Sequence, residues 1–433
     1  METRPSSVTS VAGGEAAWSD LRAIVGAENV RAATAEDAVD GVQPQMVIEP
    51  GSPDEIGRVL KTASGAGLHV IPRGGATKMD WGNPPRRADL IISTRRLNRI
   101  VEHAWGDMTA TVEAGCTLQQ LQQILAEHGQ RLALDPLWSG KATIGGILAT
   151  NDSGALRIRF GSLRDLIIGI TLVLGDGTLA KSGGKVVKNV AGYDLPKLAT
   201  GSLGTLGIIT QAIFRLHPIP RESRSLSFFT PDNATMNALV LAILDSKLVP
   251  TGLQVRSSGA SPPEIDLRLE GTAAGCDAQI DQAVRIAAGS HQVEVRADVW
   301  NSRAALWGRA EPSVVCKFTL LPASMGTFFD KVREVAERAH LQWRLVAQAV
   351  GAGFLRLEGD GDAADVWHSA IVELRQGLEA RGGSLVVLRC PSEVKAKLDV
   401  WGSSGDALSV MKSVKAQFDP AGVLNPGRFI GGI

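Results

Sequence analysis

The sequence contains little cysteine and no closely spaced cysteine pairs. Only four cysteines occur in 433 residues, and each is far from the next. A disulfide framework, or a zinc or iron–sulfur centre held by cysteine pairs, needs several cysteines at short spacing. These structures are excluded, and a reducing cytosol is the simplest compartment. The cysteines are Cys116, Cys276, Cys316 and Cys390.

The sequence also lacks an excess of charge and any long apolar run. Lys plus Arg number 45 and Asp plus Glu number 45, so no overall field attracts nucleic acid or an anionic membrane. No stretch reaches about 18 apolar residues, and the N-terminus has neither the basic start nor the apolar core of a secretory signal. We expect a cytoplasmic protein without a membrane span.

The histidines and the single tyrosine are poor candidates for metal ligands or catalytic residues. The seven histidines show no convergent ligand spacing, so we expect no metal site. Tyr193 is the only tyrosine. Its surroundings are typical of a packed turn in which Asp194 caps the next helix, and a catalytic phenol is the less favoured alternative.

Glycine is abundant, at 48 of 433 residues against a usual share of about 7%. The length predicts two or three domains. The first glycine-rich segment follows a strand, a helix and a second strand. The strand at Met46–Ile48 leads to a capping box at Ser52 and Glu55, and a strand at Leu68–Ile71 ends in the segment Pro72–Lys78, which we call the glycine loop.

A second glycine-rich segment, Thr143–Gly154, follows another helix. That helix begins at Thr117 and ends near Gly129. Short strands precede it at 89–93, 100–102 and 109–113, and a short helix is expected between residues 146 and 150. The side chains predicted to face inward are Leu118, Leu121, Ile124 and Leu125.

Two common nucleotide motifs do not fit this sequence. Residues 175–182 approach the phosphate loop of NTPases, but they lie in a predicted hairpin of 167–174 and 178–181, where that loop needs a following helix. No Gly-x-Gly-x-x-Gly opens a helix after the first strand, which argues against a Rossmann nicotinamide site. A strand at 207–216 closes this part of the chain.

Residues after 221 alternate between helices and strands. Helices are predicted at about 235–246, 276–288, 326–340 and 363–380, and residues 265–269 alternate strictly between apolar and charged. This pattern favours an α+β arrangement, with a half-exposed antiparallel sheet covered by helices on one face. A final helix is expected at 411–418.

The two glycine-rich segments predict an anion site. Consecutive backbone N–H groups can form an anion-binding nest, Thr77 can donate a hydroxyl, and glycine lets a ligand approach the backbone closely. A diphosphate could lie between the two segments. The alternative is that the glycines serve only turns.

Five segments in this order resemble the PCMH-type FAD-binding domain of the vanillyl-alcohol-oxidase superfamily. They are residues 72–78, 143–146, 151–154, 184–195 and 201–209, and residues 418–427 resemble the usual end of one branch. That branch comprises glycolate and D-lactate dehydrogenases, including the FAD-binding subunits of glycolate oxidase. The resemblance implies two α+β subdomains holding FAD, then a cap domain. The divisions are 1–42, 43–220, 221–410 and 411–433.

The resemblance also implies site residues. The glycine loop would hold the pyrophosphate, and it contains no histidine for covalent attachment, so FAD should be non-covalent. Arg356 and Arg389, on predicted cap strands, are the candidate catalytic residues. The implied FAD-binding residues are Pro72, Arg73, Gly74, Gly75, Ala76, Thr77, Lys78, Pro136, Thr143, Ile144, Gly145, Gly146, Asn151, Ser153, Gly154, Gly207, Ile208 and Ile209.

The function implied is oxidation of glycolate or a similar small 2-hydroxy acid, with electrons passed to a partner. The implied partners are a metal-bearing homologous FAD subunit and an iron–sulfur subunit, through which the complex could lie at the inner membrane face. Metal-dependent relatives carry His-x-Gly-Asp-Gly-Asn-x-His on a cap strand, where this sequence has Ala349 to Arg356. The alternative is therefore a non-catalytic scaffold or electron-relay subunit that holds FAD.

Overall fold

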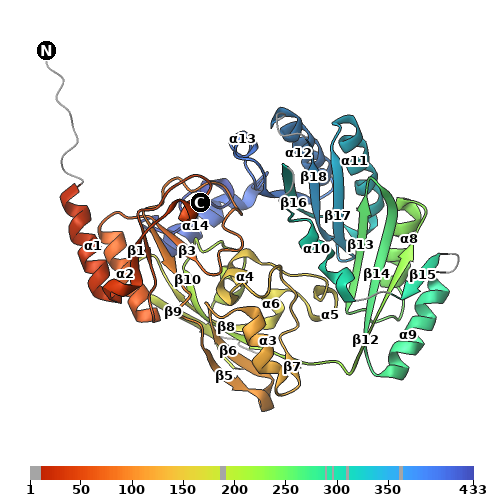
Figure 1. Ribbon diagram of the computed structural model, residues 1–433, viewed down its shortest axis with the longest axis horizontal. Coiled ribbons are helices and arrows are strands. Elements are labelled where there is room, and N and C mark those ends of the chain that lie inside the picture. Colours follow the sequence, from red (N-terminus) through yellow and green to blue (C-terminus); the bar gives the residue numbers. More distant parts are fainter. Residues whose placement is uncertain (1–10, 186–191, 288–289, 295–296, 309–311, 360–363) are drawn as a thin grey trace.

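The first of three main sheets has four strands and lies near the N-terminus (Figure 1). The computed structural model describes residues 11–185, 192–287, 290–294, 297–308, 312–359 and 364–433. Helices α1 (Val11–Val25) and α2 (Pro53–Gly65) pack on one face of this sheet. The strand order is β1 (Val30–Ala32), β2 (Met46–Ile48), β4 (Leu90–Ser93) and β3 (Val70–Arg73), with β1 antiparallel and the others parallel.

Helix α2 begins as the sequence predicts. The Ser52 hydroxyl accepts a hydrogen bond from the Glu55 N–H at 3.1 Å. The Glu55 carboxylate, however, accepts from the N–H of Gly51 at 2.7 Å, one residue before the expected Ser52. The helix carries the chain across to β3, so the glycine loop leaves the sheet at the carboxyl end of a buried parallel strand.

The second sheet is antiparallel and has five strands. Its buried face packs against α3 (Leu118–Ala126), α4 (Ile144–Thr150) and α6 (Leu163–Leu166). Ile124 was predicted to face inward but is 37% exposed, because α3 buries the stripe of Leu118, Leu121 and Leu125. The strand order is β5 (Ile100–Ala104), β6 (Thr109–Glu113), β10 (Ile208–Arg215), β8 (Ile167–Val173) and β9 (Leu179–Gly183).

The predicted hairpin and the Asp194 cap are confirmed, but the expected packing of the turn at Tyr193 is wrong. Strands β8 and β9 pair in antiparallel fashion. Asp194 accepts a hydrogen bond from the Lys197 N–H at 3.1 Å and so caps α7 (Leu195–Ala199). Tyr193 is 91% exposed, which gives its phenol no enclosed site. Residues 186–191 of the family-like segment lie outside the described residues.

The third sheet is antiparallel and forms, with its helices, what we call the cap domain (Figure 1). Helices α8 (Asn233–Leu244), α9 (Ala273–Ile286), α11 (Met325–Arg338) and α12 (Ala364–Glu379) share one apolar core with one face of the sheet, as predicted. The strand order is β15 (His291–Glu294), β12 (Glu222–Phe229), β14 (Ser261–Gly271), β13 (Gly252–Ser258), β17 (Gln342–Gln348), β18 (Ala352–Glu358), β16 (Ser313–Thr319) and β19 (Ser384–Arg389).

The other face of the cap sheet is not open to solvent, contrary to the prediction of a half-exposed sheet. Asp266 on β14 has no exposed surface. Residues 297–308, which include α10 (Ser302–Ala305), lie against this face, and we call them the interdomain segment. Their position between the cap sheet and the rest of the chain could not be read from the period-two pattern.

The chain ends beside the first sheet. After α14 (Leu408–Phe418), the Val70 N–H donates to the Val423 carbonyl at 2.8 Å and the Asn425 N–H to the Val70 carbonyl at 2.9 Å. The remaining elements are short: α5 (Arg157–Phe160), α13 (Ser392–Lys395), and β7 (Gln130–Arg131) paired with β11 (His217–Pro218).

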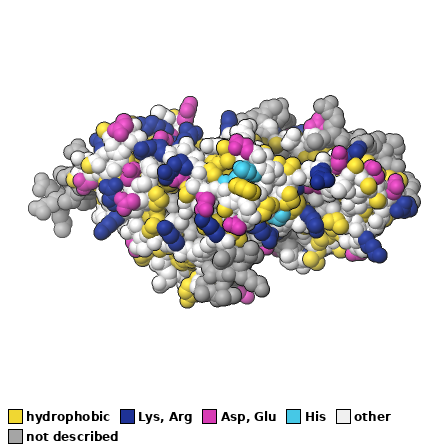
Figure 2. All heavy atoms as spheres, turned by 90° about the horizontal axis from the view of Figure 1, so that it is seen from below, with side chains coloured by type: hydrophobic (Ala, Val, Ile, Leu, Met, Phe, Trp, Pro, Cys, Tyr) yellow, Lys and Arg dark blue, Asp and Glu magenta, His cyan; other side chains and the backbone are white. Residues whose placement is uncertain are grey.

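The surface carries mixed charge. Basic and acidic side chains are interspersed on the face drawn in Figure 2, in line with 45 residues of each sign in the sequence. Among the described residues, no helix has the length and apolar character needed to cross a bilayer.

Candidate functional site

The glycine loop presents unused hydrogen-bond donors. Among the described residues, none accepts a hydrogen bond from the backbone N–H groups of Gly74 to Lys78. Ala76 has a φ of 57°, a left-handed conformation that is uncommon outside glycine. Such a run of N–H groups can bind an anion. The guanidinium of Arg73, in contrast, donates to Asp37 at 2.6 Å, so that side chain is already paired.

The two glycine-rich segments touch each other. A Cβ at Gly74 would lie 2.1 Å from the Thr143 hydroxyl, and a Cβ at Gly75 would lie 1.8 Å from the Lys141 carbonyl oxygen. These glycines therefore allow one loop to pack on the other. This is a different reason from the one expected, which was direct approach of a ligand to the backbone.

Three adjoining cavities follow the glycine loop. The first is lined by Pro72, Arg73 and Gly74 together with Gly145, Gly146 and residues 207–209. The second lies beside residues 74–79, Thr143 and Gly146. The third, of about 840 Å³, is lined by Gly75, Ala76 and Thr77 and reaches Trp138, Trp307 and Arg389. Shared lining residues make them one continuous run from β10 to the cap domain.

Unpaired polar atoms mark the same place. The Thr143 hydroxyl is buried and makes no hydrogen bond in the structure, and the same holds for the side-chain oxygen of Asn425. The Lys78 ammonium is also buried, and it forms an ion pair with Asp152 at 3.1 Å. Buried polar groups are normally satisfied, so this concentration indicates a bound group. Residues with positive φ also lie here, at Ala76, Trp138, Leu203 and Asn425.

Five of the predicted FAD-binding residues do not line these cavities. Ile144 packs in the core of the second sheet, and Pro136 is buried. A Cβ at Gly154 would meet the Asp135 side chain at 2.6 Å, so that glycine serves packing. The Ser153 carbonyl accepts from Arg303 of the interdomain segment at 2.6 Å. The fifth is Asn151, whose left-handed conformation ends α4.

An aromatic cluster joins the glycine loop to the cap domain. The rings of Trp81 and Trp307 stack at 5.8 Å, and Trp138 meets Trp307 edge-on at 5.1 Å. Trp81 and Trp307 are 3% and 5% exposed. The Lys78 ammonium lies 5.7 Å and 5.5 Å from the rings of Trp81 and Trp138. Trp138 and Trp307 of this cluster line the third cavity.

The two candidate catalytic arginines have different surroundings. Arg389 lines the large cavity, donates to Asp80 at 2.9 Å and lies over the Trp307 ring. Arg356 is 1% exposed, forms an ion pair with Glu358, and donates to the carbonyls of Leu306 at 2.8 Å and Gly308 at 2.7 Å. Arg356 therefore holds the interdomain segment, and only Arg389 lies at the cavities.

Sequence reasoning missed Lys317, which lies in the middle of β16. Its neighbours Cys316 and Phe318 belong to the apolar core under the helices, so Lys317 is on the opposite face of the sheet. Burial lowers the pKa of Lys317, and the charge of Asp152 opposes that shift. A lysine inside an otherwise apolar strand was the available signal.

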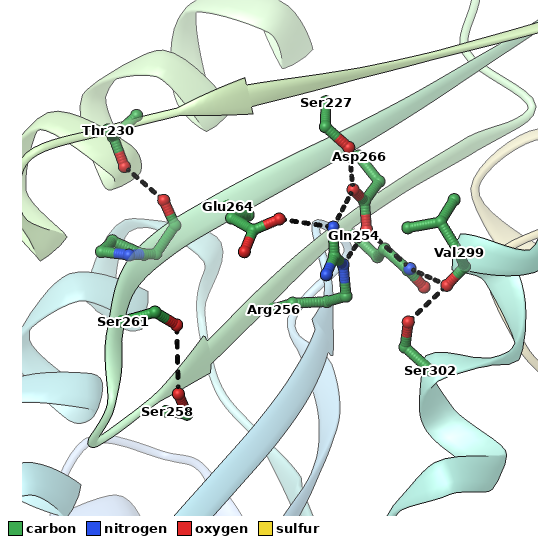
Figure 3. A network of polar contacts seen from close by, with 11 residues as sticks. Ser227, Thr230, Gln254, Arg256, Ser258, Ser261, Glu264, Asp266, Val299 and Ser302 are labelled. Atoms are coloured by element: carbon green, nitrogen blue, oxygen red, sulfur yellow. Dashed lines mark hydrogen bonds and ion pairs between the residues drawn. The ribbon is translucent and has the colours of Figure 1, made fainter. Parts of the chain in front are cut away.

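A polar network holds the interdomain segment (Figure 3). Asp266 accepts hydrogen bonds from Ser227 at 2.5 Å, Gln254 at 2.9 Å and Arg256 at 2.7 Å. Gln254 also donates to the Val299 carbonyl at 3.2 Å, so the network reaches the segment that carries Arg303 and Trp307. A fully satisfied buried network of this kind fixes its neighbours in one arrangement.

Residues 44–183 match the model of a family described as an FAD binding domain. The matched residues include the glycine loop, Thr143 and Gly146. This part of the chain is an FAD-binding domain. The unused N–H groups and the orphaned Thr143 hydroxyl fit the diphosphate of FAD, which needs several donors. No group of three or more possible metal ligands occurs among the described residues.

Relatives over most of the chain are named as an oxidase subunit, dehydrogenases or FAD-linked oxidoreductases. Glycolate oxidase subunit GlcD of Bacillus subtilis is 26% identical, over 89% of this chain and 88% of that protein. D-lactate dehydrogenase of Archaeoglobus fulgidus is also 26% identical, over 89% and 91%. A D-2-hydroxyglutarate dehydrogenase of Xanthomonas citri is 35% identical over 43% of this chain and 40% of that protein.

Solved structures share the whole α+β fold. p-Cresol methylhydroxylase has a TM-score of 0.78 at 17% identity, over 98% of both chains. Alkyldihydroxyacetonephosphate synthase has a TM-score of 0.75 at 18% identity, over 99% of this chain and 87% of that chain. These likenesses show the fold alone.

Proposed function

We propose that this chain is an FAD-binding subunit of a glycolate-oxidase-type complex and oxidises glycolate or a similar small 2-hydroxy acid. The names of the relatives support the substrate class. The observation that carries the proposal is Lys317, a partly buried lysine on the cap-sheet face opposite the helices, close enough to Asp152 of the FAD-binding domain for that charge to raise its pKa against the effect of burial. A small 2-hydroxy acid carries a carboxylate that such a cation would bind.

Some of the described residues would bind the cofactor, and others would bind the substrate. The N–H groups of residues 74–78 and the Thr143 hydroxyl would bind the diphosphate of FAD, and the backbone of residues 207–209 would lie at its other end. When bound, FAD supplies the hydride acceptor for the alcohol carbon. Trp81 and Trp307 would keep water from the reacting end, and Lys317 would orient the carboxylate.

A second candidate function is an FAD-holding electron-relay subunit. The commitment of Arg356 to Glu358 and to two carbonyls favours it, because the arginine that could have replaced the missing metal ligands is occupied. In that case a metal-bearing homologous FAD subunit would perform the oxidation. An iron–sulfur subunit would receive the electrons under either function.

Anaerobic mixing distinguishes the two functions. The chain is loaded with FAD and mixed with glycolate or D-lactate while the flavin absorbance is followed. The catalytic function predicts bleaching that is lost in Lys317→Met and kept in the control Lys331→Met, whose lysine pairs with Glu373 on the outer side of α11 and lines none of the three cavities. No bleaching by the chain alone, with bleaching restored when the partner subunits are added, would contradict it and support the relay function.

A further inference from the structure

Asp152 is a buried carboxylate between cations from two different parts of the molecule. Its side chain has no exposed surface. One oxygen lies 3.1 Å from the Lys78 ammonium and accepts from the Leu137 N–H at 2.9 Å. The other accepts from Arg303 at 3.0 Å. Lys78 belongs to the glycine loop and Arg303 to the interdomain segment, so Asp152 connects the two.

Arg303 ties the cap domain to the FAD-binding domain. Besides Asp152, it donates to the Ser153 carbonyl at 2.6 Å and to the Asp135 carbonyl at 2.7 Å. Its guanidinium also lies 5.3 Å from the Phe354 ring on β18. A planar guanidinium with several directed hydrogen bonds is held in one orientation. A change in the pairing of Asp152 therefore alters one contact of Arg303, while the other contacts of Arg303 stay in place.

Lys78 is the less committed partner. Its ammonium has three donors, and the one carboxylate it pairs with among the described residues is Asp152, at 3.1 Å. It is 8% exposed, at the end of the loop whose N–H groups are unused. A buried ammonium whose remaining donors lack partners is unfavourable, so an anion arriving at the loop would gain these donors.

We propose that Lys78, Asp152 and Arg303 form an ionic relay, through which an anion bound at the glycine loop sets how firmly the interdomain segment is held. Asp152 and the anion compete for Lys78. When the anion takes the ammonium, Asp152 pairs more fully with Arg303, and the segment carrying Trp307 tightens over the cavity. This inference rests on the proposed placement of the FAD diphosphate at the glycine loop.

The relay makes a distinctive prediction for FAD affinity. Arg303 does not line the three cavities along the loop. Arg303→Gln should nevertheless weaken FAD binding about fivefold or more. The reason is that Lys78 would be the only cation left for Asp152, which would then compete more strongly with the anion. In a Lys78→Met or Asp152→Asn background, the same substitution should change the dissociation constant less than about twofold. Flavin fluorescence quenching measures these constants.

Another buried ion pair between the domains provides the control. Arg131 on β7 and Glu270 on β14 are joined at 2.5 Å. Glu270→Gln should change FAD affinity less than about twofold in every background. The relay is refuted if Arg303→Gln behaves like Glu270→Gln, or if its effect is the same with and without Lys78. Wild-type chain that does not bind FAD would instead refute the proposed function.

Hydrogen exchange gives a readout that does not depend on the Arg303 variant folding. Saturating FAD should slow exchange of the backbone amides in residues 302–308 of the wild type. In Lys78→Met, saturated with FAD at higher concentration, this protection should be largely lost, and Lys78→Arg should restore it. Equal protection in Lys78→Met and wild type would overturn the relay.

Discussion

Among the glycine substitutions in the site, Gly146→Val should weaken FAD binding with the smallest effect on folding. A Cβ at this position would meet only the Thr143 hydroxyl, at 3.3 Å, while the rest of its surroundings is open. Gly146 lines the first two cavities along the glycine loop. A valine side chain would therefore enter space assigned to FAD and disturb little of the protein.

The two effects should have different sizes. Forcing extra methyl groups into an occupied site costs about 1–3 kcal/mol, which weakens FAD binding about fivefold to 150-fold. Gly146 lies within α4, where replacing glycine by alanine stabilises a helix by up to about 1 kcal/mol. Gly146→Ala should thus keep or raise the melting temperature of the FAD-free protein, and both variants should bind FAD more weakly.

Flavin fluorescence titration and thermal unfolding of the FAD-free protein test this prediction. Gly145→Ala is the matched control, because its Cβ would lie 2.8 Å from the Ala114 Cβ and so should destabilise the fold. If Gly146→Val binds FAD as tightly as the wild type, the diphosphate does not pass Gly146, and the assignment of the loops is wrong.

Three further predictions concern single groups. Thr143→Ala should weaken FAD binding by about 1.5–3 kcal/mol, which is the usual contribution of a hydrogen bond to a charged group. Calorimetric titration measures this change. An unchanged affinity would mean that the Thr143 hydroxyl does not bind the diphosphate. Burial lowers the pKa of the Lys78 ammonium, so above that lowered pKa an anion can bind only with uptake of a proton. FAD affinity should consequently decrease as pH rises, and the decrease should begin at a lower pH than it would with a lysine of ordinary pKa. In Lys78→Arg, FAD titrations at a series of pH values should not show this decrease. Burial raises the pKa of the Cys390 and Cys316 thiols to about 12, so on the order of one in 10⁴ of each is ionised at pH 8. A thiol-specific dye should label the native protein only slowly and count four thiols after unfolding. Rapid native labelling of Cys390, which is only partly buried, would contradict its raised pKa.

Local signals in the sequence predict much of this fold. The cap of α2 at Ser52, the hairpin of β8 and β9, and the four cap-domain helices each depend on residues close together in the chain, and all are present. The glycine loop is likewise indicated by its composition after a buried strand. Segments that depend on such neighbours are the ones that periodicity and capping rules describe.

Long-range contacts explain what the sequence did not predict. Gly74 and Gly75 are required by a loop about 70 residues away, which no local pattern reveals. Arg356 resembled a free substrate clamp in the strand pattern, but two carbonyls of the interdomain segment occupy it. The role of Asp152 as an ion-pair partner follows from the fold, which places Lys78 and Arg303 beside it although both are distant in sequence.

The most direct test of the central claim is equilibrium titration of the purified chain with FAD. The glycine loop, the orphaned donors around it and the family match predict that one FAD binds per chain and shows the absorbance bands of protein-bound flavin. They also predict that protein denaturation releases all of it, because the attachment is non-covalent. A folded chain that stays colourless after incubation with excess FAD, with no change in flavin fluorescence, would contradict the account.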